Sequence, residues 1–305
     1  MKTRQAKPFL KWAGGKSQLL SQFEALYPTE LKQGNIKRYI EPFVGGGAVF
    51  FDIVQKYHLS SACISDVNPE LVMVYQVIQK EPEKLIEQLD DISRKYQTLS
   101  EDGRKIFYYE LRDKFNLQRL QIDYHKYHDD WTSRSAILIF LNRTCFNGLF
   151  RLNSKGEFNV PHGRYKNPKI LDAENLIAVS QLLQSTEIVN CDFAACKDAV
   201  IPQSFIYFDP PYRPLSKTAN FTSYAKSNFD DLQQIRLANF FKQLHESYEV
   251  KMMLSNSDPK NENPEDSFFE DLYQEFKIHR VFANRMINSK AQKRGRITEL
   301  VITNY

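Results

Sequence analysis

The sequence predicts an α/β fold with a mostly parallel sheet, and three features lead to this prediction. Several short apolar runs have the length of buried strands, and residues 204–208 (SFIYF) are the clearest. Glycine-rich turns or acidic residues follow these runs, at the strand ends where open α/β sheets bind ligands. A long stretch with helical spacing, from Pro69 to about Leu141, interrupts the pattern and indicates an inserted region.

The composition limits the class of protein. The chain has 305 residues, 42% of them hydrophobic, which suffices for a full core, and its net charge of +4 permits a nucleic-acid partner without requiring one. The longest clearly apolar run, residues 136–141, is too short to cross a bilayer, and no signal peptide is recognisable. We therefore expect a cytoplasmic protein with no membrane partner and no obligate protein partner. Four cysteines form no CxxC pair, which predicts free thiols and no metal site: Cys63, Cys145, Cys191 and Cys196.

The N-terminal stretch KPFLKWAGGK, residues 7–16, predicts a loop before a helix over residues 17–26. Gly14 and Gly15 favour a tight turn. Trp12 and the lysines beside it, Lys11 and Lys16, can hold an aromatic ring and an anion at a helix N-terminus. An ordinary capped loop with exposed lysines would have the same composition, so this stretch alone leaves both interpretations open.

Residues 38–51 predict a strand, a glycine turn and a helix. Gly45 and its two glycine neighbours allow the backbone to approach a ligand closely. A second strand over residues 62–65 ends at Asp66, about 20 residues beyond the turn, where an acid can accept ribose hydroxyls. Together the turn and the acid predict a nucleoside-containing cofactor. The absence of a GxxxxGK[ST] loop argues against a nucleotide hydrolase.

Residues 142–169 are rich in asparagine, glycine, arginine and lysine, with aromatic residues between them. The SKG sequence at residues 154–156 predicts a turn, and therefore a hairpin. Such a projecting loop suits phosphate contact, base-edge reading and base stacking. A solvated surface loop is the alternative.

The C-terminal part predicts the remaining strands. Residues 186–191 form a third strand followed by Asp192 and Phe193, and residues 230–247 form an amphipathic helix. A further strand is expected over residues 250–254, and residues 278–282 and 297–303 are expected to pair at the end of the sheet. The loop between them is basic and is either solvated or a clamp for phosphates through Lys290, Lys293, Arg294 and Arg296.

The strand at residues 204–208 is followed by Asp209, Pro210, Pro211 and Tyr212. Two consecutive prolines cannot donate to a ladder, so the strand must end there. The Asp209 carboxylate and the Pro210 carbonyl can each accept one hydrogen of a planar amino group, which positions its nitrogen for methylation. Tyr212 can stack on the ring that carries the amine, and a base in a duplex must be flipped out to reach it. A plain strand end with a proline turn is the alternative.

With these motifs the chain resembles, almost end to end, the Dam-type DNA adenine-N6 methyltransferases. The segments that carry the resemblance are FLKWAGGK at 9–16, EPFVG at 41–45, NGLFR at 147–151, GEFNVP at 156–161 and DPPY at 209–212. The resemblance implies a Rossmann-like, S-adenosylmethionine-dependent methyltransferase fold with an inserted helical and hairpin DNA-recognition region. We expect residues 1–68 and 170–305 to form the catalytic domain, and residues 69–169 to recognise the target.

The resemblance also implies particular residues. S-adenosylmethionine is the expected cofactor, with Trp12, Lys16, Asp66 and Asp209 lining its site and Asp192 and Phe193 near its adenine. Double-stranded DNA is the expected substrate, with GATC as the site. Its expected readers are Lys11, Asn147, Leu149, Arg151 and Pro161. Phe146 stands where the enterobacterial-type enzymes carry tyrosine. Phenylalanine can still stack into the duplex, but it lacks the tyrosine hydroxyl and any hydrogen bond from it.

Other functions remain open at this stage. They are adenine methylation at another DNA sequence, methylation of RNA or of a protein glutamine, and DNA binding without catalysis. The predicted hairpin argues against RNA and protein substrates, and the intact tetrad argues against an inactive protein. Nothing in these motifs separates a restriction–modification enzyme from an orphan regulator.

Overall fold

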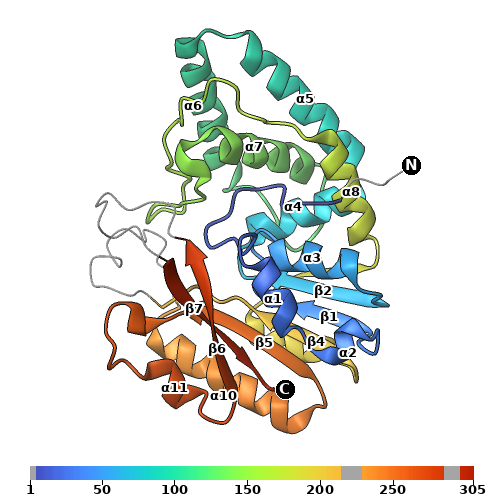
Figure 1. The fold of residues 1–305 in the computed structure, drawn as a ribbon. Coiled ribbons are helices and arrows are strands. Elements are labelled where there is room, and N and C mark those ends of the chain that lie inside the picture. The colour runs from blue at the N-terminus through green and yellow to red at the C-terminus, as the bar shows by residue number, and fades with distance from the viewer. Residues whose placement is uncertain (1–4, 214–228, 285–295) are drawn as a thin grey trace. The chain divides into compact units, whose positions relative to one another are not determined.

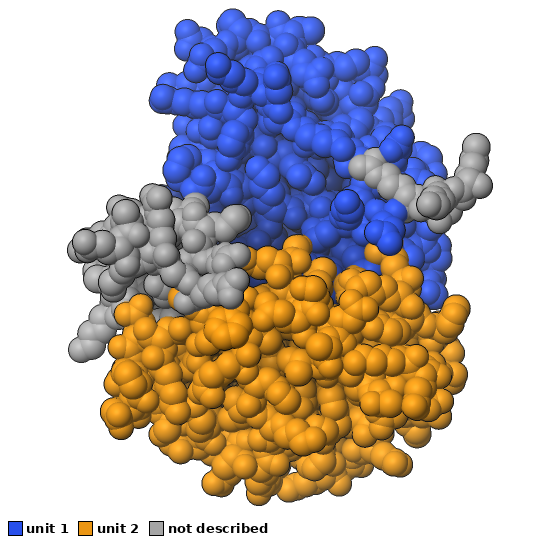
Figure 2. All heavy atoms as spheres, viewed as in Figure 1, with its two compact units in different colours: residues 1–15, 45–51, 66–190 blue, residues 16–44, 52–65, 191–305 orange. Residues whose placement is uncertain are grey.

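The structure is a computed structural model that describes residues 5–213, 229–284 and 296–305. The chain divides into two compact units, shown in blue and orange in Figure 2. Unit 1 contains residues 1–15, 45–51 and 66–190, and unit 2 contains residues 16–44, 52–65 and 191–305.

The described strands form one seven-stranded sheet with the order β3-β2-β1-β4-β5-β7-β6 (Figure 1). β1 pairs in parallel with β2 and β4, and β4 pairs in parallel with β5, whereas β7 is antiparallel to both β5 and β6. The prediction of a mostly parallel sheet with an antiparallel end is confirmed. The strands are β1 Arg38–Glu41, β2 Ser61–Asp66, β3 Thr186–Asn190, β4 Ser204–Phe208, β5 Lys251–Ser257, β6 Lys277–Asn284 and β7 Arg296–Thr303.

Unit 2 contains most of this sheet and the helices that pack on it. All five residues of β4 are buried, as a continuous apolar run in a parallel sheet requires. Phe208 contacts Phe241 of α10, with ring centroids 5.9 Å apart, and Asp230 caps that helix by accepting from the Gln233 amide at 3.0 Å. The helices of this unit are α1 Leu20–Leu26, α2 Thr29–Lys32, η2 Phe193–Ala199, α10 Asp231–Ser247, η3 Pro259–Asn261 and α11 Phe268–Leu272, while α3 Ala48–Lys56 begins in unit 1.

Unit 1 is mainly helical, as the spacing from Pro69 onward predicts. Asn68 caps the first long helix by accepting from the Glu70 amide at 3.1 Å, and Pro69 occupies its first turn. α7 packs against α4, α5 and α6, which explains why it is buried on nearly all sides and shows no single apolar face. The helices are α4 Pro69–Lys80, α5 Pro82–Thr98, α6 Glu101–Gln118, α7 Asp130–Thr144, η1 Phe146–Gly148 and α8 Ala173–Leu183.

A buried ion pair joins these helices. Arg134 of α7 is 1% exposed and donates through Nε to Glu70 Oε2 at 2.9 Å, with a second contact to Glu70 Oε1. Its Nη1 donates to the Phe115 carbonyl at 2.6 Å, and Tyr124 donates to Glu70 Oε1 at 2.6 Å. A buried charge is tolerated only when it is paired and hydrogen-bonded in this way.

The predicted hairpin is present, but its arms are irregular and contain only single bridges. The Asn153 amide donates to the Glu157 carbonyl at 2.9 Å, and the Asn159 amide donates to the Arg151 carbonyl at 3.2 Å. Leu152 pairs with Phe158, and Cys145 pairs with His162. The turn closes where the Gly156 amide donates to the Asn153 carbonyl at 2.9 Å. No longer ladder forms in this segment, in part because Asn116 of α6 bonds to both backbone groups of Phe158. Among the described residues, no helix combines the length and the hydrophobicity needed to cross a lipid bilayer.

Candidate functional site

The tetrad leaves the sheet at the carboxyl end of β4, as predicted, and Asp209 is held there by one of its two oxygens. Asp209 Oδ1 is 2.9 Å from Lys16 Nζ and accepts from Ser255 Oγ at 2.9 Å. Ser255 is in turn 2.8 Å from the hydroxyl of Tyr207. Within the described residues Oδ2 makes no hydrogen bond, and the side chain keeps a fifth of its surface exposed. The carboxylate is therefore oriented by Oδ1 and open at Oδ2.

Burial dominates the electrostatic setting of Asp209. Burial raises the pKa of Asp209, and the Lys16 ammonium and the Ser255 hydroxyl act in the opposite direction. Lys16 itself is only 4% exposed. A buried ammonium at this distance favours the ionised carboxylate, which is the form whose oxygens can only accept hydrogen bonds.

The two prolines differ in what their carbonyls do. The Pro211 carbonyl accepts from Gln234 Nε2 of α10 at 3.0 Å, and Gln234 is itself bonded to Asn256 of β5. The Pro210 carbonyl has no partner in the part of the chain that the structure describes. The Pro211 carbonyl therefore fixes the turn, and the Pro210 carbonyl remains available as an acceptor beside Asp209.

Tyr212 is held at both its ring and its hydroxyl. Its hydroxyl donates to Glu299 Oε2 of β7 at 2.6 Å, and Lys16 Nζ lies 4.4 Å from the ring centroid. Burial raises the pKa of Glu299, and the Tyr212 hydrogen bond opposes this. The sequence analysis missed both Ser255 and Glu299. A possible signal was the lone acid in the apolar run ITELVIT of residues 297–303.

Asp192 and Phe193 also lie in unit 2, at the start of η2. Asp192 is paired through both oxygens with Arg236 of α10, which lowers the pKa of Asp192. The Arg236 guanidinium lies 4.4 Å over the Phe193 ring. Phe193 is also stacked with Phe43, with centroids 5.4 Å apart and planes 27° apart. The predicted cofactor residues here are joined by two that the sequence analysis did not select, Phe43 and Arg236.

Unit 1 brings together Trp12, Gly45 and Asp66. The Gly45 amide donates to Asp66 Oδ2 at 3.2 Å, and the Asn68 amide donates to Oδ1 at 2.9 Å. Gly45 has a φ of +48°, and a Cβ atom there would lie 3.0 Å from the indole of Trp12. Burial raises the pKa of Asp66, and the backbone amides oppose this shift. The glycine turn, the acid and the first loop, which are far apart in sequence, form one cluster.

A second cluster in unit 1 contains the predicted base readers. Asn142 at the end of α7 accepts from the Lys11 amide at 2.8 Å and donates to the Lys11 carbonyl at 2.9 Å and to the Gly148 carbonyl at 3.0 Å. Gly148 has a φ of +63°, and a Cβ atom there would lie 2.3 Å from the Lys11 side chain. The neighbouring Asn147 also has a positive φ, and its amide donates to the Tyr165 hydroxyl at 3.0 Å. Lys11 and the turn that follows α7 are thus joined tightly.

The readers differ in exposure. Phe146 is 53% exposed and Leu149 is 36% exposed, and the Phe146 amide donates to the carbonyl of the exposed Pro161 at 2.9 Å. Arg151 is half-buried and donates through Nε to Asn159 Oδ1 at 2.8 Å, which orients its guanidinium. Of the predicted phosphate contacts, Lys290, Lys293 and Arg294 lie outside the described residues, and Arg296 is the first residue of β7.

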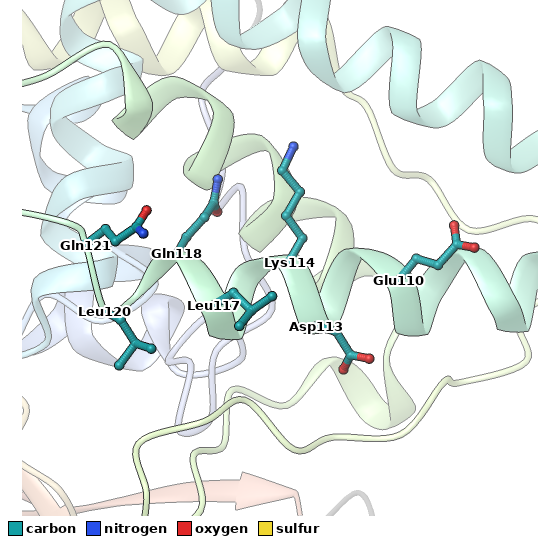
Figure 3. A pocket seen from close by; sticks show the side chains of 7 residues that line it. All are labelled: Glu110, Asp113, Lys114, Leu117, Gln118, Leu120 and Gln121. Carbon is teal, nitrogen blue, oxygen red and sulfur yellow. The ribbon is translucent and has the colours of Figure 1, made fainter.

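A shallow pocket on α6 contains none of the predicted site residues (Figure 3). It presents two exposed leucines, Leu117 and Leu120, among polar side chains.

Comparison with known proteins decides the family. The D12 class N6 adenine-specific DNA methyltransferase family matches residues 12–287. The chain belongs to this family. It is 51% identical over 302 residues, covering 99% of the chain and all of its relative, to the type II methyltransferase M.MjaIII of Methanocaldococcus jannaschii. It is 40% identical to the type II methyltransferase M1.LlaDCHI of Lactococcus lactis subsp. cremoris, covering 98% and 95% of the two chains. It is 33% identical to a DNA adenine methylase of Haemophilus influenzae, covering 97% and 92%.

As a D12 class enzyme, the protein is an adenine-specific DNA methyltransferase that acts on N6. DNA is its substrate and a methyl donor is required. The resemblance inferred from the tetrad, the glycine turn and the first loop is confirmed, and so are the fold class and the enzymatic activity.

Proposed function

We propose that this D12 methyltransferase transfers the methyl group of S-adenosylmethionine to N6 of an adenine flipped out of double-stranded DNA, at the sequence GATC. The observation that carries the chemistry is the pair of open acceptors beside Tyr212, Asp209 Oδ2 and the Pro210 carbonyl. The sequence GATC rests on the identity of the reader residues and on the resemblance to the Dam-type enzymes.

The proposed mechanism uses the protein mainly to hold the amine. Asp209 Oδ2 accepts one amino hydrogen and the Pro210 carbonyl accepts the other, which directs the nitrogen lone pair out of the ring plane. As the nitrogen bonds to carbon it gains positive charge, which the Asp209 carboxylate stabilises. Lys16 and Ser255 keep Oδ1 occupied, so the carboxylate does not rotate away from the amine. Tyr212 provides the stacking surface for the flipped base.

The residues present fit S-adenosylmethionine. Asp66 offers carboxylate oxygens for ribose hydroxyls, next to a glycine turn whose positive φ brings bare backbone close to a ligand. Phe43, which is half-buried and stacks on the buried Phe193, offers aromatic surface for an adenine ring. We propose that Trp12, Lys16, Gly45, Asp66, Asp192, Phe193 and Asp209 bind the cofactor. When bound, the cofactor supplies an electrophilic methyl group on sulfur.

We propose that residues 69–169 contain the target-recognition region and that residues 1–68 and 170–305 form the catalytic part. Arg151 matches the two acceptors of guanine, O6 and N7, and Asn159 orients its guanidinium by accepting from Nε and from Nη2. Leu149 and Pro161 are exposed apolar groups suited to a thymine methyl. Lys11 is assigned to the other guanine, and Phe146 and Asn147 to the space that the flipped base leaves.

The basic residues before and at the start of β7 are assigned to the DNA backbone. We propose that Lys290, Lys293, Arg294 and Arg296 contact phosphates. Removal of one of these residues would then weaken binding to all DNA sequences alike, and it would reduce the salt dependence of DNA binding. The names of two relatives, both type II methyltransferases, support a place in a restriction–modification system.

Restriction digestion tests the function and the sequence separately. Plasmid DNA is incubated with the protein and S-adenosylmethionine, then cut with one enzyme that requires methylated GATC and one that requires unmodified GATC. We expect the first to cut and the second to fail. Methylation elsewhere with GATC untouched would refute the sequence and leave the chemistry standing. Label transferred to RNA or to protein, but not to duplex DNA, would refute the choice of substrate.

A further inference from the structure

Glu299 occupies a fixed position in the sheet. It lies opposite Ser257 of β5 and opposite Val281 of β6, so its strand is hydrogen-bonded on both edges. A residue in the middle of such a strand keeps its place, because neither neighbour can move alone. Glu299 therefore offers Tyr212 an acceptor whose position does not depend on the loop that carries the tyrosine.

Tyr212, by contrast, belongs to no strand or helix. Its hydroxyl is the point of the side chain farthest from the backbone, so rotation about the Cα–Cβ bond moves it most. The 2.6 Å hydrogen bond to Glu299 Oε2 holds the ring at that point. Lys16 Nζ, 4.4 Å from the centroid, lies over one face of the ring.

We propose that Glu299 is a positioning residue that holds the Tyr212 ring, through its hydroxyl, in the orientation on which the flipped adenine stacks. This inference rests on the proposed function. Glu299 touches neither base nor methyl donor in this role and acts only through the tyrosine. Within the described residues, Glu299 bonds to the Tyr212 hydroxyl and also interacts electrostatically with Lys16 and Asp209, which belong to the same tetrad site.

A double-mutant cycle tests this role. Tyr212→Phe keeps the ring and removes the hydroxyl, and Glu299→Leu removes the acceptor. If Glu299 acts through the hydroxyl, each single variant should lower kcat on duplex DNA by about 10- to 100-fold, the effect of a misplaced reacting group, with KM for DNA little changed. The double variant should be no slower than the slower single variant, because the two changes break one interaction.

Three further measurements separate this role from a purely structural one. Glu299→Gln retains an oxygen acceptor and should stay within about threefold of wild type, and it also covers the case in which Glu299→Leu folds poorly. Duplexes that carry 2-aminopurine in place of the target adenine report base stacking without turnover. Their fluorescence emission should differ from that of the wild-type complex in the same way for Tyr212→Phe and Glu299→Leu. As a matched control, Glu275→Leu removes an exposed acid of unit 2 that pairs with Lys242, and both readouts should stay at wild type.

The outcomes are distinct. Losses that multiply in the double variant, or an unchanged Glu299→Leu enzyme, would overturn the role of Glu299 while the wild-type activity stands. A wild-type protein that transfers no methyl group to any duplex would overturn the proposed function instead. In that case the 2-aminopurine signal still tests whether the two residues act as one.

Discussion

The tetrad of unit 2 and the reader cluster of unit 1 use buried hydrogen bonds in opposite ways. In the tetrad the functional side chains themselves are held, Asp209 by Lys16 and Ser255, and Tyr212 by Glu299. In the reader cluster Asn142 holds backbone carbonyls and amides, while the side chains that emerge from that backbone stay exposed.

This difference follows from what each cluster must contact. A reacting amine needs acceptors at fixed positions, because misplacement by an ångström lowers the rate steeply. A base edge in a groove is reached by side chains that extend from the protein, so the protein fixes their starting points and leaves their tips free. Changes in the tetrad should therefore affect kcat on every duplex equally. Changes in Asn142, which holds the backbone that carries the readers, should affect which DNA sequence is methylated.

The largest expected effect is at Asp209. Asp209→Ala removes the strongest acceptor of the amine and should lower methyl transfer by at least about 10³-fold on all duplexes. Transfer of labelled methyl groups measures it, with Asp209→Asn as the variant that preserves shape. Turnover near the wild-type rate in Asp209→Ala would remove the carboxylate from the mechanism.

The next effect is on stability and lies in the helices of unit 1. Arg134→Met leaves Glu70 buried without its cation and should reduce the free energy of unfolding by about 3–5 kcal/mol. The double variant Arg134→Met/Glu70→Leu should recover much of this loss, because no buried charge remains unpaired. Urea denaturation followed by circular dichroism measures both. An Arg134→Met protein as stable as wild type would show that the pair contributes nothing net.

A smaller effect is expected at Asn142, and it should appear as altered specificity. Asn142→Ala removes three hydrogen bonds that join Lys11 to the Gly148 turn, and should reduce discrimination at both outer guanines by about 1–3 kcal/mol. The measurement compares kcat/KM on GATC with kcat/KM on duplexes altered at either end.

The chain provides a close control for this experiment. Asn175, 3% exposed, bonds to the amide and the carbonyl of Lys7 just as Asn142 bonds to those of Lys11. Asn175→Ala should cost similar stability and leave specificity intact. Equal loss of specificity in both variants would mean that any loss of stability in unit 1 lowers specificity, and that Asn142 has no special role.

The sequence was informative where a local pattern determined the structure. Pro210 and Pro211 end β4 because they lack amide hydrogens, so the sequence alone predicts Asp209 at the edge of the sheet. Asp66 was predicted in the same way, from the end of a strand and its spacing from Gly45.

The partners of these residues were not predictable from the sequence. Ser255 reaches Asp209 because β5 lies beside β4, and Glu299 reaches Tyr212 because β7 lies beside β5. Nothing local in the sequence specifies either pairing or its register. The hairpin was predicted from its turn residues, but the irregularity of its arms was not, because the bonds from Asn116 to Phe158 cannot be seen in the sequence. Asn142 was seen only as part of a polar stretch, since its role depends on a loop 131 residues away.

The smallest expected effect is a displacement of the pH profile, and it probes how firmly the tetrad is held. Burial raises the pKa of Asp209, while Lys16 and Ser255 oppose the rise. The ionised carboxylate is the active form, so activity should be present above this pKa and should fall as the pH drops through it. Ser255→Ala removes one opposing hydrogen bond, which should move this acid limb to higher pH with little loss of the plateau rate.

Tyr207→Phe is the matched control for Ser255→Ala. It removes the hydroxyl behind Ser255 and leaves the bond from Ser255 to Asp209 in place, so its acid limb should move less. The measurement is kcat against pH for the three proteins on one duplex. An acid limb that is identical in wild type and Ser255→Ala would mean that Lys16 alone sets the ionisation of Asp209. A limb that moves to lower pH would contradict the hydrogen-bond assignment, because removing a donor cannot favour the ionised carboxylate.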